Sequence, residues 1–191
     1  GAPATSRGSH TATLLANGRV LIARGAAARG ATSTFLTGAE LYDPTSGLFT
    51  ASAGSLATAR AEHEAVLLGN GSVLLVGGTS VLTAELFTVA GGGTFTAPSG
   101  PLAQARVRAH TATLLANGNV LVAGGEGAGS PTPYLGTTEV FAPAGGTFGS
   151  SGSLLTPRIS HTATKLPDGK VLLVGGSSGL VSALDTAELY Q

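Results

Sequence analysis

Short apolar runs recur along the chain at nearly constant intervals, and glycine follows three of the four runs directly. The runs are Val20–Ala23, Val73–Val76, Val120–Ala123 and Val171–Val174. A continuous apolar run of this length, bounded by turn residues, is typical of a strand buried on both faces. Alternating apolar and polar positions follow each run, at residues 39–42, 84–87, 138–141 and 187–190, and this pattern predicts a further strand in each case.

A two-residue turn precedes each apolar run. The turns are Asn17-Gly18, Asn70-Gly71, Asn117-Gly118 and Asp168-Gly169. Because Asn-Gly and Asp-Gly accept positive φ at both turn positions, each turn predicts a tight hairpin between the apolar run and the segment before it. A short fourth strand is expected at residues 48–50, 94–96 and 147–149, where an aromatic residue recurs.

These elements form a repeat of about 50 residues that occurs four times. The four histidines of the chain, His10, His63, His110 and His161, mark the same position in each copy and are 53, 47 and 51 residues apart. One four-stranded unit cannot bury both of its faces alone, so neighbouring units must stack. We therefore predict an all-β fold of four blades, over approximately 7–59, 60–106, 107–157 and 158–191, in one domain that spans 1–191. The last blade lacks its fourth strand.

The order of these features resembles the kelch repeat, and the resemblance covers nearly the whole chain. The matching features are the double glycine after the apolar run (Gly77-Gly78, Gly124-Gly125, Gly175-Gly176), and the aromatic residues on the third and fourth strands. Kelch repeats usually carry Trp on the fourth strand, where this chain has Phe49, Phe95 and Phe148. The resemblance implies a β-propeller. Three arrangements stay open: part of a longer propeller, two chains in an eight-bladed ring, or a closed four-bladed ring.

Composition narrows the classes of function. Ten basic and ten acidic residues give a net charge of zero, and the basic residues are scattered, which argues against nucleic-acid binding. No apolar run approaches the roughly 18 residues that a membrane helix needs. The chain has no Cys and no Met, few Lys, and much Ala, Gly, Ser and Thr. We take this composition as an indication of a processed, exported bacterial protein, in an extracellular or periplasmic compartment.

Two further polar positions repeat with the histidines, and all three are interpreted as structural. Glu40, Glu85, Glu139 and Glu188 lie on the predicted third strands, where a carboxylate needs a buried partner. Arg7, Arg60 and Arg158 lie three residues before the histidine, whereas the third copy has Arg106 and Arg108 instead. We expect these glutamates to pair with the repeat arginines or histidines and to tie the third strand to the following linker. The histidines are expected to form a ring at one mouth of the channel and to bind no metal.

Residues that depart from the repeat point to a different surface. Only Phe35 and Tyr134 are aromatic residues outside repeat positions, and both fall in the loop between the second and third strands. These loops hold 13, 5, 12 and 10 residues in the four copies. Because loops on a rigid scaffold often carry binding, we expect a protein or glycan to bind there. The candidate residues are Phe35, Tyr134, Arg24, Arg29, Glu126 and Asp185.

The same resemblance extends to the propeller of galactose oxidase, which bears on catalysis. That family uses a copper site with a thioether-linked Tyr and Cys, and a chain without Cys cannot form this cofactor. No nucleophile elbow, phosphate loop or sialidase repeat occurs either. The sequence therefore predicts a non-catalytic binding or assembly module without a cofactor. The alternatives are a structural propeller fragment that self-assembles, for example through an open strand edge at residues 188–190, and an incomplete oxidase-like enzyme propeller.

Overall fold

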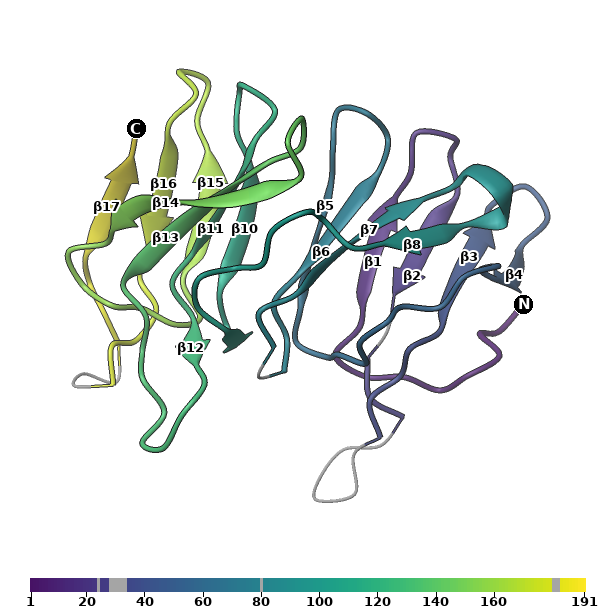
Figure 1. Ribbon diagram of the computed structural model, residues 1–191, viewed down its shortest axis with the longest axis horizontal. Coiled ribbons are helices and arrows are strands. Elements are labelled where there is room, and N and C mark those ends of the chain that lie inside the picture. The colour runs from purple at the N-terminus through teal and green to yellow at the C-terminus, as the bar shows by residue number, and fades with distance from the viewer. Residues whose placement is uncertain (24, 28–33, 80, 180–182) are drawn as a thin grey trace.

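The computed structural model describes residues 1–23, 25–27, 34–79, 81–179 and 183–191. Four antiparallel sheets lie side by side along the long axis of the molecule (Figure 1). Within each of these four sheets the strands follow the order of the chain. The first sheet comprises β1 (Thr11–Leu14), β2 (Val20–Ala23), β3 (Ala39–Asp43) and β4 (Leu48–Ala51). The second comprises β5 (Glu64–Leu67), β6 (Val73–Val76), β7 (Ala84–Thr88) and β8 (Thr94–Thr96).

The other two sheets repeat this topology with differences. The third comprises β10 (Thr111–Leu114), β11 (Val120–Ala123), β13 (Thr137–Ala142) and β14 (Thr147–Ser153), and the fourth has β15 (Thr162–Lys165), β16 (Val171–Val174) and β17 (Ala187–Tyr190). A short 3₁₀ turn, Ala90–Gly92, precedes β8. Two strands that the sequence pattern did not indicate, β9 (Arg106–Arg108) and β12 (Glu126–Gly127), pair with each other beside the third sheet.

The predicted hairpins are present in every sheet. In the first, Leu14 pairs with Val20 and Thr11 with Ala23, and Gly18 has a φ of 82°. Gly71, Gly118 and Gly169 have positive φ of the same size. Since the register of a strand decides which side chains face each neighbour, these turns fix the faces of all four sheets.

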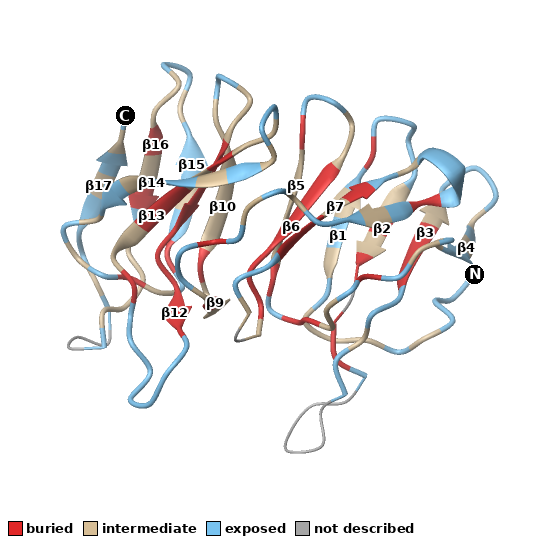
Figure 2. Ribbon diagram, in the orientation of Figure 1, coloured by how far each residue is buried: buried red, intermediate tan, exposed pale blue. Residues whose placement is uncertain are grey.

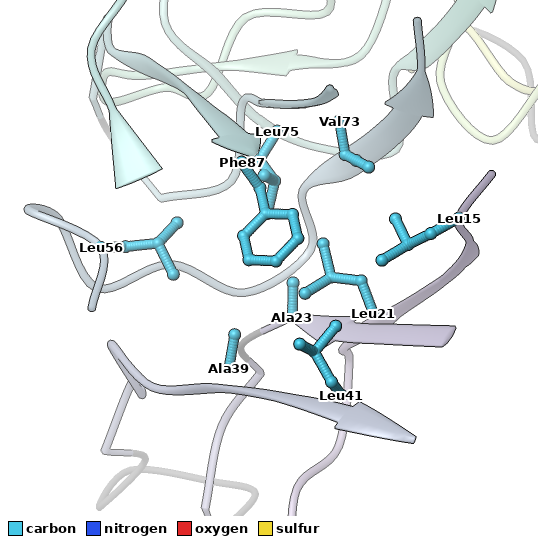
Figure 3. Close-up of a cluster of buried hydrophobic side chains, with 9 residues drawn as sticks. All are labelled: Leu15, Leu21, Ala23, Ala39, Leu41, Leu56, Val73, Leu75 and Phe87. Atoms are coloured by element: carbon cyan, nitrogen blue, oxygen red, sulfur yellow. The ribbon is translucent and has the colours of Figure 1, made fainter. Parts of the chain in front are cut away.

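The two faces of each sheet pack on different neighbours. Leu21 and Ala23 of β2 face the second sheet, where they contact Val73, Leu75 and Phe87 in one buried cluster (Figure 3). Side chains one position along the same strands point the other way. Leu74 and Val76 therefore pack with Val120, Val122 and Phe141 of the third sheet, and Leu121 and Ala123 pack with Val171 and Leu173 of the fourth. The inner runs, β6 and β11, are thus packed on both sides, as their continuous hydrophobicity predicts, whereas β2 and β16 each pack on one side only.

The stack of sheets is open. The first strands of neighbouring sheets lie against each other, β1 beside β5, β5 beside β10, and β10 beside β15. The N- and C-terminal sheets lie at opposite ends of the molecule, and burial is greatest between them (Figure 2). The fold is therefore β-propeller-like, but the chain does not close into a four-bladed ring. No helix in the described part of the chain is long and apolar enough to cross a membrane.

Candidate functional site

A buried Arg–Glu pair occurs in every sheet, and we call each pair with its hydrogen bonds a clasp. The pairs are Arg7–Glu40, Arg60–Glu85, Arg106–Glu139 and Arg158–Glu188. The glutamate lies on the third strand, and the arginine lies in the segment that enters the sheet. The predicted pairing of these glutamates with arginine is present. The third copy uses Arg106, which the sequence spacing left undecided, because one residue more separates it from its histidine.

The second sheet shows how a clasp is built. Arg60 Nη1 donates to the carbonyl oxygens of Gly77 and Thr83 at 3.1 and 2.7 Å, and Nη2 donates to Glu85 Oε1 at 3.3 Å. The Glu85 carboxylate also accepts the backbone N–H groups of Ala57 and Thr58, at 2.9 and 3.3 Å. The glutamate therefore ties the third strand to the linker that precedes its own sheet. The prediction that it ties the following linker is wrong.

Burial removes the charged side chains of the clasps from water, which costs free energy. Arg60, Arg106 and Arg158 are fully buried, and Glu85 and Glu139 are nearly so. Desolvation lowers the pKa of Arg60 and of Arg106, and the partner glutamate acts in the opposite direction. Because each guanidinium keeps its charge beside a carboxylate and two carbonyl oxygens, the arrangement stabilises a fixed structure. It leaves no nucleophile or base free for a reaction.

The histidines join neighbouring sheets. His63 Nε2 and Thr11 Oγ1 form a hydrogen bond of 2.9 Å between the second and first sheets. His161 Nε2 and Thr111 Oγ1 form the corresponding bond of 3.0 Å between the fourth and third. His110 Nε2 instead donates to the Val76 carbonyl at 3.2 Å. Burial lowers the pKa of His110 and of His161 to about 4, so both rings are neutral at pH 7.

Two copies depart from this contact. His10 is exposed, because the described residues before it form no sheet on that side. On β5, Glu64 takes the position that Thr11, Thr111 and Thr162 occupy in the other copies. This carboxylate lies at the boundary with the third sheet, and desolvation raises its pKa to about 7. Sequence reasoning missed Glu64, although its difference from three threonines was a visible signal.

Replacing Glu64 with threonine is expected to stabilise the protein at alkaline pH. A carboxyl whose folded pKa lies above its usual 4.5 favours folding below pH 4.5, and this contribution is lost as pH rises through about 7. Chemical unfolding should therefore show a gain of about 1–3 kcal/mol at pH 8, discounted for partial exposure, and little gain at pH 4. Glu64→Gln, which keeps the shape without the charge, should show the same pH dependence. A gain that does not change with pH would contradict the assignment. Since His110 and His161 titrate in both proteins, they cancel in the difference.

The loop residues that we predicted as a binding surface do not form one site. Glu126 is buried and pairs with Arg108 Nε at 2.6 Å on the β9–β12 pair. Tyr134 is 36% exposed, and its ring covers Gly179 of the next copy. Phe35 is exposed and pairs through its backbone with Ala26 of the first copy, and Asp185 is exposed in the fourth. Arg24 and Arg29 lie outside the described residues. Binding at these loops stays a prediction.

Comparison with solved structures identifies the fold. The chain is similar to a fungal alcohol oxidase of the AA5 family, solved in complex with copper, with a TM-score of 0.76 and 18% sequence identity. The match covers 98% of this chain and 42% of the oxidase, so this chain spans less than half the length of that enzyme. The fold of this chain therefore resembles part of that structure. No family model and no curated protein matches the sequence.

This comparison corrects the expectation that the chain is not an enzyme. We based that expectation on the missing Cys and the missing motifs, but the solved structure that shares this fold is an alcohol oxidase. A sequence argument from absent residues tests only the reactive centre, and it says nothing of the scaffold that carries such a centre.

The residues of this chain nevertheless do not fit a copper centre. Among the described residues, no three His, Cys, Asp or Glu side chains gather closely enough to hold a metal ion. Nε2 of His63, His110 and His161 is already used between the sheets. The chain also has no Cys. A copper-dependent reaction would therefore need ligands that this chain does not supply.

Proposed function

We propose that this chain is part of the propeller scaffold of an oxidase-like enzyme, with repeats of the kelch type. The observation that carries the proposal is the match of nearly the whole chain to less than half of a copper alcohol oxidase. The clasps and the histidine bonds support it, because they use the repeated polar residues to hold the sheets rather than to react. In this role the chain positions other parts of the enzyme, and the ligands of the reactive centre come from outside it.

The test compares two samples in a peroxide-coupled assay with Cu(II) and primary alcohols. One sample is this chain by itself, and the other is the complete product of the gene that encodes it. We expect alcohol-dependent peroxide formation by the complete product and none by the chain alone. A complete product that neither binds copper nor oxidises alcohols would contradict the proposal. Copper-dependent turnover by the chain alone would also contradict it, since the centre would then lie within these residues.

The predicted export of the chain from a bacterial cell is part of the same proposal. An exported bacterial protein with this composition would meet its substrates outside the cytoplasm, where a peroxide-forming oxidase does less harm to the cell. Fractionation of the source cells, with the chain detected by antibody, would test this compartment directly. Recovery of the chain in the cytoplasmic fraction would contradict it.

A further inference from the structure

The tip of the first hairpin in each sheet carries a chemically reactive pair of residues. The pair is Asn-Gly in the first three sheets and Asp-Gly in the fourth, at Asn17, Asn70, Asn117 and Asp168. All four of these residues are exposed. The four hairpins end at the same edge of the molecule (Figure 1). Water therefore reaches the same reactive position in every copy.

The first hairpin shows how the two residues are held. The Gly18 N–H donates to the Leu15 carbonyl at 3.0 Å and closes the turn. Asn17 Oδ1 accepts the N–H of Arg19 at 3.1 Å. The ring that this second bond closes contains both the side-chain carbonyl carbon of Asn17 and the backbone nitrogen of Gly18, and the bond draws electron density away from that carbon. The turn thus holds an electrophilic carbon on the side of a backbone nitrogen.

The other three turns have the same hydrogen bonds. The N–H two residues after Asn70, Asn117 and Asp168 donates to the side-chain Oδ1 at 3.0, 3.1 and 3.1 Å. The Gly N–H of each turn donates to a leucine carbonyl at 3.0, 3.2 and 3.0 Å. Asp168 therefore accepts with a carboxylate the bond that the three asparagines accept with an amide. An aspartate fits this turn and keeps both of its hydrogen bonds.

We propose that Asn17, Asn70 and Asn117 are sites of spontaneous deamidation in the folded protein, and that the aspartate product stays in the turn. The Gly nitrogen loses its proton to water and bonds to Cγ of the asparagine, and the bond from Cγ to the side-chain nitrogen breaks. That nitrogen takes up a proton and leaves as ammonia. Glycine favours this step because it has no side chain to hinder the approach.

The cyclic imide then adds one water molecule at either of its two carbonyl carbons. Breaking the bond from the Gly nitrogen to Cγ gives aspartate, and breaking the other C–N bond gives isoaspartate. Each reaction therefore gains one water and loses one ammonia. Isoaspartate adds one atom to the backbone of the turn, whereas aspartate leaves the backbone unchanged.

Deamidation changes the charge at this edge of the molecule. Each new carboxyl group is ionised at pH 7, because the usual pKa of aspartate is about 3.9. Three carboxylates added to a net charge of zero give a formal charge of minus three. With Asp168 the hairpin tips then carry four carboxylates in place of one. This inference does not rest on the proposed function.

Peptide mapping by mass spectrometry tests the sites directly, on folded protein kept at mildly alkaline pH and on the chain unfolded in urea as the reference. All three Asn-Gly sites should convert in the folded protein, with a half-time longer than in the unfolded chain by about ten-fold at most, because an exposed hairpin tip opens locally at little cost. Asn119 is the internal control, since the branched side chain of Val120 follows it and hinders the attack. A longer half-time, no conversion, or equal conversion at Asn119 would overturn the proposal.

Low concentrations of urea distinguish local opening from unfolding of the whole chain. The unfolded fraction rises steeply with urea even below the transition, because the free energy of unfolding falls linearly with denaturant. We expect the three deamidation rates to stay constant over this range. Rates that rise in step with the unfolded fraction would show that the folded protein does not react, and the proposal would be wrong.

Two variants test the fourth turn and the product. Asp168→Asn makes all four turns alike, and residue 168 should then convert at a rate similar to the other three. An asparagine that persists at this position would contradict the account. The combined variant Asn17→Asp, Asn70→Asp and Asn117→Asp should migrate with the aspartate form of the aged protein on isoelectric focusing and unfold at the same temperature as fresh protein. A clearly lower midpoint would overturn the claim that the turn accommodates the product.

Discussion

Replacing Arg106 with methionine is expected to lower the free energy of unfolding by about 3–5 kcal/mol, because the change leaves the carboxylate of Glu139 buried without its partner. The guanidinium is fully buried, donates to the Gly124 carbonyl at 2.7 Å and lies 3.1 Å from Glu139 Oε1. Such a loss is a large share of the stability of an ordinary domain. Urea unfolding at pH 7, monitored by far-UV circular dichroism, would measure it.

A double-mutant cycle with Glu139→Gln separates the pair from its surroundings. If the clasp is a coupled unit, the combined variant should lose about 1–3 kcal/mol less than the sum of the single losses. Lys170→Gln provides the matched control, because Lys170 pairs with Asp168 at 3.4 Å on the exposed surface and should change stability very little. An Arg106 variant as stable as the control would contradict the structural role of the clasps.

Replacing Gly78 with alanine is expected to cost about 3 kcal/mol or more. Gly78 has a φ of 74°, and an added Cβ would lie 2.3 Å from the carbonyl oxygen of Ala61. Since this atom belongs to the backbone of the linker, neither partner can rotate away. The linker would have to move, and with it the neighbouring clasp of Arg60. The midpoint of thermal unfolding, measured by calorimetry, should fall sharply.

Gly71→Ala is the matched control for this prediction. Gly71 has a similar φ of 83°, but an added Cβ there would meet no atom within 4 Å. This substitution therefore carries only the conformational cost of a left-handed residue, about 1–2 kcal/mol. Equal losses for the two variants would show that the close approach at Gly78 contributes nothing beyond its backbone angle.

Much of the fold could be predicted from the sequence because the same pattern of strands and turns occurs in four copies. Each Asn-Gly or Asp-Gly turn fixed a hairpin, and the four apolar runs fixed strands, of which β6 and β11 are buried on both faces. The partners of the glutamates were predictable too, since a carboxylate on a covered strand needs a cation and arginine was the repeated one. These conclusions depend on local chemistry that recurs in every copy.

Other features depend on spacing that differs by one residue, and sequence reasoning could not resolve them. In the linkers Leu56 and Leu102 are buried, but Leu155 is 93% exposed and Leu154 packs against the core instead. The Leu155 N–H donates to Glu188 at 2.6 Å, as the Ala57 N–H donates to Glu85 in the second sheet. The additional pairing of β9 with β12 likewise occurs in the copy that has one more residue between its clasp arginine and His110. The repeat pattern did not predict this pairing.

The candidate loop residues do not gather at one site for a different reason. Phe35 and Tyr134 were chosen because they break the repeat, but Phe35 is exposed in the first copy and the Tyr134 ring covers Gly179 of the fourth. Glu64 breaks the repeat on a covered face, where a charge has consequences for stability. A departure from the repeat is therefore informative only when burial is known, and burial between sheets is a property of the whole stack.

The openness of the stack is the central claim about the fold, and spin-label distances test it most directly. A chain without Cys allows unique labels at equivalent exposed turn positions, Ala16, Gly69 and Pro167, each replaced by cysteine. Labelled protein diluted in an excess of unlabelled protein reports distances within one chain only. We predict that the first-to-last pair, 16 and 167, lies much farther apart than the adjacent pair, 16 and 69. Equal distances for the two pairs would show a closed four-bladed ring and would contradict the account.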